Sequence, residues 1–100
     1  MSEQIPTDNI HDKINRETAR IHWNEVATFF ASGKLIYISQ DADLIDLAMA
    51  MTQDEADKVK QWMSAGQVYN ATDEQAIEWQ ENNTEFWAVV IRPWILVQEA

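Results

Sequence analysis

The strongest constraint on the fold is an apolar run near the C-terminus, from Phe86 to Val97, which reads FWAVVIRPWILV. Ten of its twelve residues are apolar, so both faces of a strand built from them would be apolar. That pattern is typical of a strand covered on both sides. Proline donates no ladder hydrogen bond and is confined to edges, strand starts or bulges. We therefore predict two strands, or one sharply bent strand, hinged at Arg92-Pro93, with part of this region at an edge or a bulge.

The length of 100 residues fits a single domain spanning residues 1–100, with residues 1–7 as a flexible tail. The chain contains no cysteine, which excludes disulfides, thiolate metal sites and cysteine nucleophiles. Its first residues, MSEQIPTDN, include an acid and no apolar run, unlike a signal peptide. The run at 86–97 is too short to span a bilayer. We therefore expect a cytoplasmic protein.

Negative charge is the clearest feature of the composition. Seventeen acids against seven bases give a formal net charge of −10, and no Lys or Arg occurs between Gln61 and Ile91. Such a surface repels phosphates, so we expect neither nucleic acid nor membrane as a partner. The acids form either a solvated face or a patch for a basic protein partner.

Two helical patterns occupy the N-terminal third. The first is expected to begin near Asp8 or Asn9, either of which caps a helix well. The second carries an apolar face and ends at Gly33, a residue suited to a helix C-terminus. Whether the two helices are continuous or broken near His22 is left open by the sequence.

The middle of the chain predicts a hairpin. Leu35 to Ile38 is a short strand, residues 39–43 form a polar turn, and Leu44 to Met51 is a second strand with period-two apolar positions. Leu, Ala and Met are weak strand formers, so a helix over 44–51 remains the alternative. Val68-Tyr69 is a further short strand.

Two capping boxes predict helix starts at Thr52 and Thr72, each with Glu or Gln three residues later. The first helix would place Ala56, Val59, Trp62 and Met63 on one face and end at Gly66, and Thr52→Ala would cost about 1 kcal/mol. The second would turn Ala76, Ile77 and Trp79 inward and close at Asn82-Asn83.

The resulting order of helices and strands has no regular βαβ alternation. We therefore predict an α+β fold, in which a small, mainly antiparallel sheet of about four to five strands packs with three to four helices.

The sequence contains no pattern for catalysis, metal or cofactor binding, so we predict no catalytic residues, metal ligands or cofactors. His11 and His22 have no partner ligands at a metal-site spacing. The acids at Asp41, Asp43 and Asp46 lack the Gly and Glu that a calcium loop requires. The Ser32-Gly33-Lys34 stretch is a helix end rather than a phosphate loop.

Tryptophan and one arginine are the features that invite a functional interpretation. Trp23, Trp62 and Trp79 fall on inward helix positions and predict core packing, although Trp is also enriched at interface hot spots. Arg92 is the only cation after Gln61. It is expected either to pair with a carboxylate or lie exposed at the bend, or to offer its guanidinium to an anionic ligand.

Several segments resemble a known family. They are GKLIYI (33–38), DLIDLAMAM (43–51), VKQWMSAGQV (59–68), DEQAIEW (73–79) and FWAVVIRPWILVQE (86–99). The chain resembles the bacterial family called domain of unknown function 2288 from about Ile14 to Glu99, most specifically in PWILVQE. The resemblance implies a bacterial, single-domain, cytosolic protein and implies no activity, ligand or site residue.

The function predicted is that of a small, non-catalytic interaction protein that forms a homodimer. Pairing near the C-terminal strands would protect an apolar edge, and its interface residues would be Trp87, Arg92, Pro93 and Trp94. The alternative is a protein, or an enzyme, that binds a small anionic molecule in a pocket near Arg92.

Overall fold

The computed structural model describes residues 7–100, and side chains from Ile10 onward. Of the tail predicted over residues 1–7, residues 1–6 lie outside the described residues, and the placement of Thr7 in the tail is wrong, because Thr7 is the first residue of a helix. The helices are α1 (Thr7–Glu17), α2 (Trp23–Ala31), α3 (Leu44–Thr52), α4 (Ala56–Ser64) and α5 (Asp73–Asn82). The strands are β1 (Ala19–His22), β2 (Leu35–Ile38), β3 (Val68–Asn70), β4 (Glu85–Ile91) and β5 (Trp94–Glu99).

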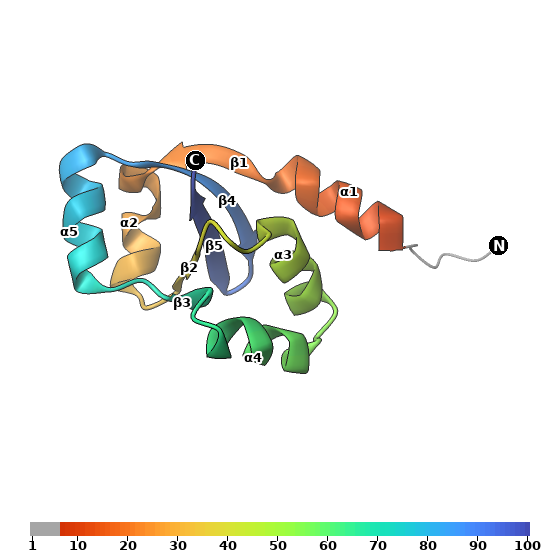
Figure 1. Ribbon diagram of the computed structural model, residues 1–100. Coiled ribbons are helices and arrows are strands. Elements are labelled where there is room, and N and C mark those ends of the chain that lie inside the picture. The colour runs from red at the N-terminus through yellow and green to blue at the C-terminus, as the bar shows by residue number, and fades with distance from the viewer. Residues whose placement is uncertain (1–6) are drawn as a thin grey trace.

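The five strands form one sheet in the order β1-β4-β5-β2-β3. Only β2 and β5 run parallel, and the other three pairs are antiparallel. Helices α2 and α5 cover one face, α3 and α4 lie on the other, and α1 extends from β1 beside α3 (Figure 1). The α+β prediction with a mainly antiparallel sheet is confirmed, and the described residues contain five helices rather than three to four.

The C-terminal run forms the hairpin that the sequence predicts. Strands β4 and β5 pair along their length, and Ile91 opposes Trp94 across a turn made by Arg92 and Pro93, whose peptide bond is cis. Both strands lie inside the sheet, and its edges are β1 and β3. The prediction that Pro93 places this region at an edge or a bulge is wrong, because Pro93 lies in the turn.

Residues 44–51 form a helix, so the predicted hairpin with 35–38 is wrong. The Asp43 carboxylate accepts hydrogen bonds from the amides of Ile45 (2.8 Å) and Asp46 (3.1 Å), which caps α3. Leu44, Leu47 and Ala48 form the buried stripe of that helix. The apolar residues also fit a period of two, but Leu, Ala and Met favour the helix. Strand β2 pairs instead with β3 and β5.

The helix start predicted at Thr52 is also wrong. Thr52 is the last residue of α3, and its hydroxyl donates to the carbonyl oxygen of Ala48 at 2.8 Å. Helix α4 begins at Ala56, and Glu55 at its N-cap forms no capping hydrogen bond through its side chain. The cost of about 1 kcal/mol expected for Thr52→Ala therefore no longer follows from a lost cap.

The capping box at Thr72 is confirmed. Its hydroxyl accepts from the Gln75 amide at 3.2 Å, and the Gln75 side-chain oxygen accepts from the Thr72 amide at 3.0 Å. Helix α5 closes at Asn83, which has a φ of 45°. Two other predicted ends are confirmed, because Gly33 follows α2 and Gly66 follows α4, both with positive φ.

Thr72→Ala is expected to lower the free energy of unfolding by about 1 kcal/mol, because it leaves an amide of the first turn without its acceptor. Thr52→Ala, which removes a hydroxyl from a helix end without removing a cap, is the matched control and should cost less. Urea titration of both variants checks this. Equal losses in the two variants would contradict the assignment of the cap.

Strand β1 separates the two N-terminal helices, which settles the question left open near His22. It pairs with β4 from Ala19 opposite Ala88 to His22 opposite Glu85. Helix α1 begins at Thr7, slightly before the predicted start, and the proposed caps Asp8 and Asn9 lie outside the described side chains.

The sheet divides the core into two clusters. The first, beneath α2 and α5, contains Trp23, Tyr37, Trp79 and Phe86, and the second, beneath α3, contains Leu47 and Leu96. Trp23 and Trp79 are thus core residues, as predicted, whereas the predicted inward residue Ile77 is exposed. Helix α4 has no fully buried side chain, even though it is amphipathic.

Candidate functional site

Helix α4 packs only partly against the rest of the protein, and a cavity lies on each side of it. On the predicted apolar face of the helix, Val59 and Trp62 are half-buried, and Met63 is 52% exposed. One cavity opens toward α3, and the other opens toward the sheet at the β4–β5 turn. We call them the polar cleft and the apolar groove.

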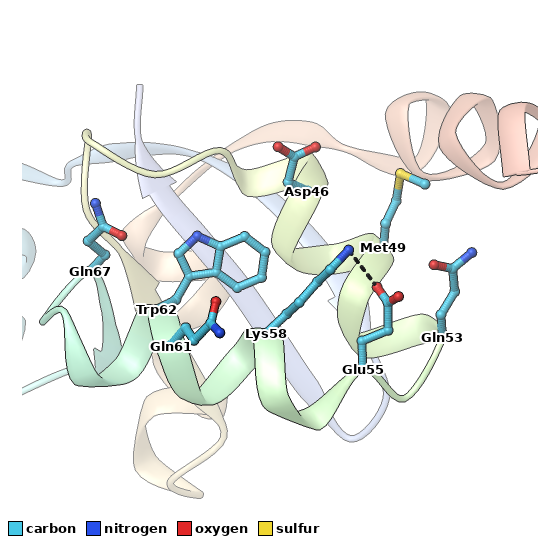
Figure 2. A pocket seen from close by; sticks show the side chains of 8 residues that line it. All are labelled: Asp46, Met49, Gln53, Glu55, Lys58, Gln61, Trp62 and Gln67. Carbon is cyan, nitrogen blue, oxygen red and sulfur yellow. Dashed lines mark ion pairs between the residues drawn. The ribbon is translucent and has the colours of Figure 1, made fainter.

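The polar cleft has a volume of about 660 Å³, within the range of small-molecule sites. Its lining residues come from α3, from α4 and from the chain on either side of α4: Asp46, Met49, Gln53, Glu55, Lys58, Gln61, Trp62 and Gln67. Figure 2 shows Trp62 and Lys58 extending from α4 toward α3, with Gln67 and Gln53 at opposite ends of the cleft. The Lys58 ammonium pairs with the Glu55 carboxylate at 3.4 Å.

The apolar groove consists of two hollows of about 480 and 230 Å³ that share Met51, Val59 and Trp94. Ile36 of β2 and Met63 of α4 line the smaller hollow, so the groove runs between α4 and the sheet. Arg92 and Ile91 line the larger hollow at the β4–β5 turn.

Charges of both signs surround this groove. The larger hollow is lined by Lys60 and Arg92 and by Asp54 and Glu55. The Lys34 ammonium lies 5.7 Å from the centre of the Trp94 ring, within the range of a cation–π interaction. Within residues 10–100, neither Lys60 nor Arg92 forms an ion pair. Arg92 therefore matches the prediction of exposure at the bend.

The structure brings together three of the four predicted interface residues. Arg92, Pro93 and Trp94 form or adjoin the β4–β5 turn, whereas Trp87 opposes Gln98 further along the hairpin. Trp87 is 41% exposed, and the Arg20 guanidinium lies 5.3 Å from the centre of its ring. Arg20 also pairs with Glu85. Trp87 thus belongs to a separate surface beside β1.

The other candidates for metal or phosphate binding either cap or end helices or lie exposed on the surface. Asp43 caps α3, and Ser32 and Gly33 end α2. His11 and His22 are exposed on α1 and β1. Within the described part of the chain, no three His, Asp or Glu side chains lie close enough together to hold a metal ion.

The polar cleft was not predicted from the sequence, because a strand over 44–51 would place Asp46 and Met49 on opposite faces. Only a helix at that position, joined to α4 by a short turn, places both residues in the same lining as Trp62. The available signal was the weak strand propensity of LIDLAMAM.

The side chain of Tyr37, whose pKa is strongly raised, lies away from both cavities. Burial beneath α5 raises the pKa of Tyr37 to about 12, and the negative charge of the nearby Glu99 adds to this shift. The Glu99 carboxylate also accepts a hydrogen bond of 3.1 Å from the Trp79 indole. Neither the polar cleft nor the apolar groove is lined by Tyr37 or Glu99. We interpret this network as structural.

The Tyr37 pKa predicts a pH dependence of stability. The folded state holds the phenol proton up to about pH 12, whereas the unfolded chain loses it near 10.0. The stability that this group contributes is therefore complete below pH 10 and is lost as the pH rises toward 12. Urea titrations at about pH 8 and about pH 11.5 should show a smaller advantage of wild type over Tyr37→Phe at the higher pH. An unchanged difference would contradict the pKa assignment.

None of the helices in residues 7–100 is both long and apolar enough to cross a membrane.

Comparisons with known proteins agree with the fold and the resemblance. Residues 9–99 match the family described as "Protein of unknown function (DUF2288)". The fold is similar to the NMR solution structure of PA1075 from Pseudomonas aeruginosa, with a TM-score of 0.79 and 36% sequence identity. The match covers 99% of this chain and 90% of that one. Among curated proteins, none matches the sequence. The family match and the level of identity show that the chain belongs to the DUF2288 family of proteins of unknown function.

Proposed function

We propose that this chain is a non-catalytic interaction protein that pairs with a second copy of itself through the apolar groove. The observation that carries the proposal is the incomplete burial of α4, whose side chains Val59 and Met63 face the groove together with Trp94. An amphipathic helix gains most of its stability by burying its apolar face. Covering this face with a second copy would supply the burial that a single chain leaves incomplete.

The charges around the groove favour a second copy as the occupant. A two-fold axis places the same surface on both sides of an interface, so each rim meets its own copy in the opposite orientation. The rim carries Lys60 and Arg92 as well as Asp54 and Glu55, and is therefore complementary to itself. Opposite charges across an interface fix its register and disfavour wrong partners.

The non-catalytic part of the proposal follows from the sequence, which contains no nucleophile, metal or cofactor pattern. For the pairing we propose the same interface residues that the sequence predicts, Arg92, Pro93 and Trp94, but for a different physical reason. The residues meet a partner through an apolar groove rather than through an open strand edge.

Sedimentation equilibrium from about 1 µM to several hundred micromolar tests this function. The proposal predicts a species with twice the mass of the chain, 11.6 kDa, and raised salt should weaken the pairing, because exposed ion pairs are screened. A chain that stays monomeric throughout this range contradicts the proposal.

A second candidate function is the binding of a small anion by Arg92. It is favoured by the two cations, Arg92 and Lys60, that line one hollow without an ion pair within residues 10–100. Asp54 and Glu55 line the same hollow and oppose an anion. Isothermal titration with citrate, repeated on Arg92→Ala, tests this function. Binding to wild type that the variant loses would support it, and no heat above dilution would exclude citrate-like ligands.

A further inference from the structure

The polar cleft has a lining that the proposed pairing does not use. It opens on the flank of α4 that faces α3, and the apolar groove opens on the other flank; of their lining residues only Glu55 is shared. We propose that the polar cleft binds a neutral, hydroxyl-rich small molecule of the size of a mono- or disaccharide.

Unused amide groups are the first observation that supports this proposal. Gln98 donates to the carbonyl oxygens of Ser39 and Ala42, and Gln40 donates to that of Glu99, whereas the exposed Gln80 side chain on α5 forms no hydrogen bond within the described residues. Within the described residues, the side chains of Gln53, Gln61 and Gln67 form no hydrogen bond, and all three line the cleft. Each amide offers both a donor and an acceptor, which is what a hydroxyl group requires.

An aromatic wall is the second observation. The Trp62 ring is half-buried and extends from α4 toward α3 (Figure 2). The face of an indole ring carries partial negative charge and its body is apolar, so it suits the weakly positive C–H face of a sugar ring. Trp62 and Met49 are the apolar members of the lining, and the other six lining residues are polar or charged, which suits a ligand rich in hydroxyl groups.

The charges of the cleft disfavour an anionic occupant. Lys58 and Glu55 neutralise each other at 3.4 Å, which leaves the Asp46 carboxylate as the remaining charge of the lining. That carboxylate, together with a net charge of −10, disfavours a phosphate or carboxylate ligand. A carboxylate also accepts hydrogen bonds from hydroxyl groups.

Nuclear magnetic resonance on the full ¹⁵N-labelled chain tests this inference. The probes are glucose and maltose as neutral ligands, with choline chloride and sodium phosphate as charged ones. We expect a sugar to shift the Trp62 indole resonance and the side-chain amides of Gln53, Gln61 and Gln67, with a Kd of about 1 mM or tighter. Shifts with choline or phosphate alone would overturn the assignment of ligand class, and no shift with any sugar would overturn the site.

Two glutamine variants, one inside the polar cleft and one outside it, test whether the sugar binds at this site. Gln61→Ala removes an exposed amide of the cleft and should weaken sugar binding about three- to tenfold, the effect of one lost hydrogen bond. Gln80→Ala, the same change at an exposed position of α5, is the matched control and should bind as wild type does. Equal affinity in both variants would contradict the assignment. The proposed pairing is measured separately by sedimentation, so that either proposal can fail alone.

Discussion

Trp79→Ala is expected to lower the free energy of unfolding by about 3–5 kcal/mol, the usual cost of removing a buried aromatic side chain. Trp79 is 1% exposed and lies at the centre of the first core cluster. Its ring centre is 5.0 Å from that of Phe86 in an edge-on arrangement and 5.3 Å from that of Tyr37. The variant also removes the indole donor that Glu99 accepts.

A loss of this size is a large part of the stability of a small domain, so the alanine variant is at risk of not folding. Trp79→Phe keeps much of the apolar volume and should cost less, which allows a urea titration in either case. Trp87→Ala is the surface control and should cost less than Trp79→Ala, because Trp87 is 41% exposed. A Trp79→Ala variant as stable as the Trp87 variant would contradict the description of the core.

Trp94→Glu is expected to weaken self-association about 30-fold or more, because a charge replaces an aromatic side chain at the centre of the proposed interface. Trp94 lines both hollows of the apolar groove. Trp87→Glu, the same change at an exposed Trp on the separate surface beside β1, is the matched control and should leave the dimer intact.

Trp94 is half-buried in a single chain, so its replacement can also disturb the fold. Arg92→Glu avoids this difficulty, because Arg92 is exposed at the turn. The substitution reverses one charge on the rim of the groove. We expect this variant to weaken the dimer as well, and circular dichroism confirms the fold of each variant. If Trp87→Glu dissociates the dimer and Trp94→Glu does not, the interface lies on the other surface.

Much of the fold could be predicted from the sequence, because several of its signals are local. The apolar hairpin 86–97 carries its own turn at Arg92-Pro93, and the Thr72 capping box satisfies two amides within four residues. Gly33 and Gly66 end helices through a positive-φ conformation that glycine adopts more readily than most other residues. Such features depend little on the rest of the chain.

The errors arise where the local pattern fits two structures. Residues 44–51 satisfy a period of two and a helical stripe, and the Asp43 cap together with burial against the sheet decides for the helix. Once α3 runs to Thr52, its hydroxyl bonds within α3 and no longer caps α4. Strand β1 has only four residues, so its alternation of apolar and polar side chains is too short to distinguish it from the helical patterns on either side, and its pairing with β4 defines it.

The residues of the two cavities also differ in how far the sequence predicts them. Arg92 and Trp94 are predicted from the sequence as interface residues of the apolar C-terminal stretch. In the structure both line the apolar groove. The lining of the polar cleft could not be predicted, since Asp46, Trp62 and Gln67 converge only when 44–52 and 56–64 are two packed helices.

Isotope-filtered NMR on a one-to-one mixture of labelled and unlabelled chains observes the proposed pairing directly. Nuclear Overhauser effects between the two kinds of chain arise only across an interface. Pairing through the apolar groove predicts such effects between the Trp94 ring of one copy and the Met51, Val59 and Met63 side chains of the other. Intermolecular effects confined to Trp87 and the β1 surface, or none at millimolar concentration, would contradict it.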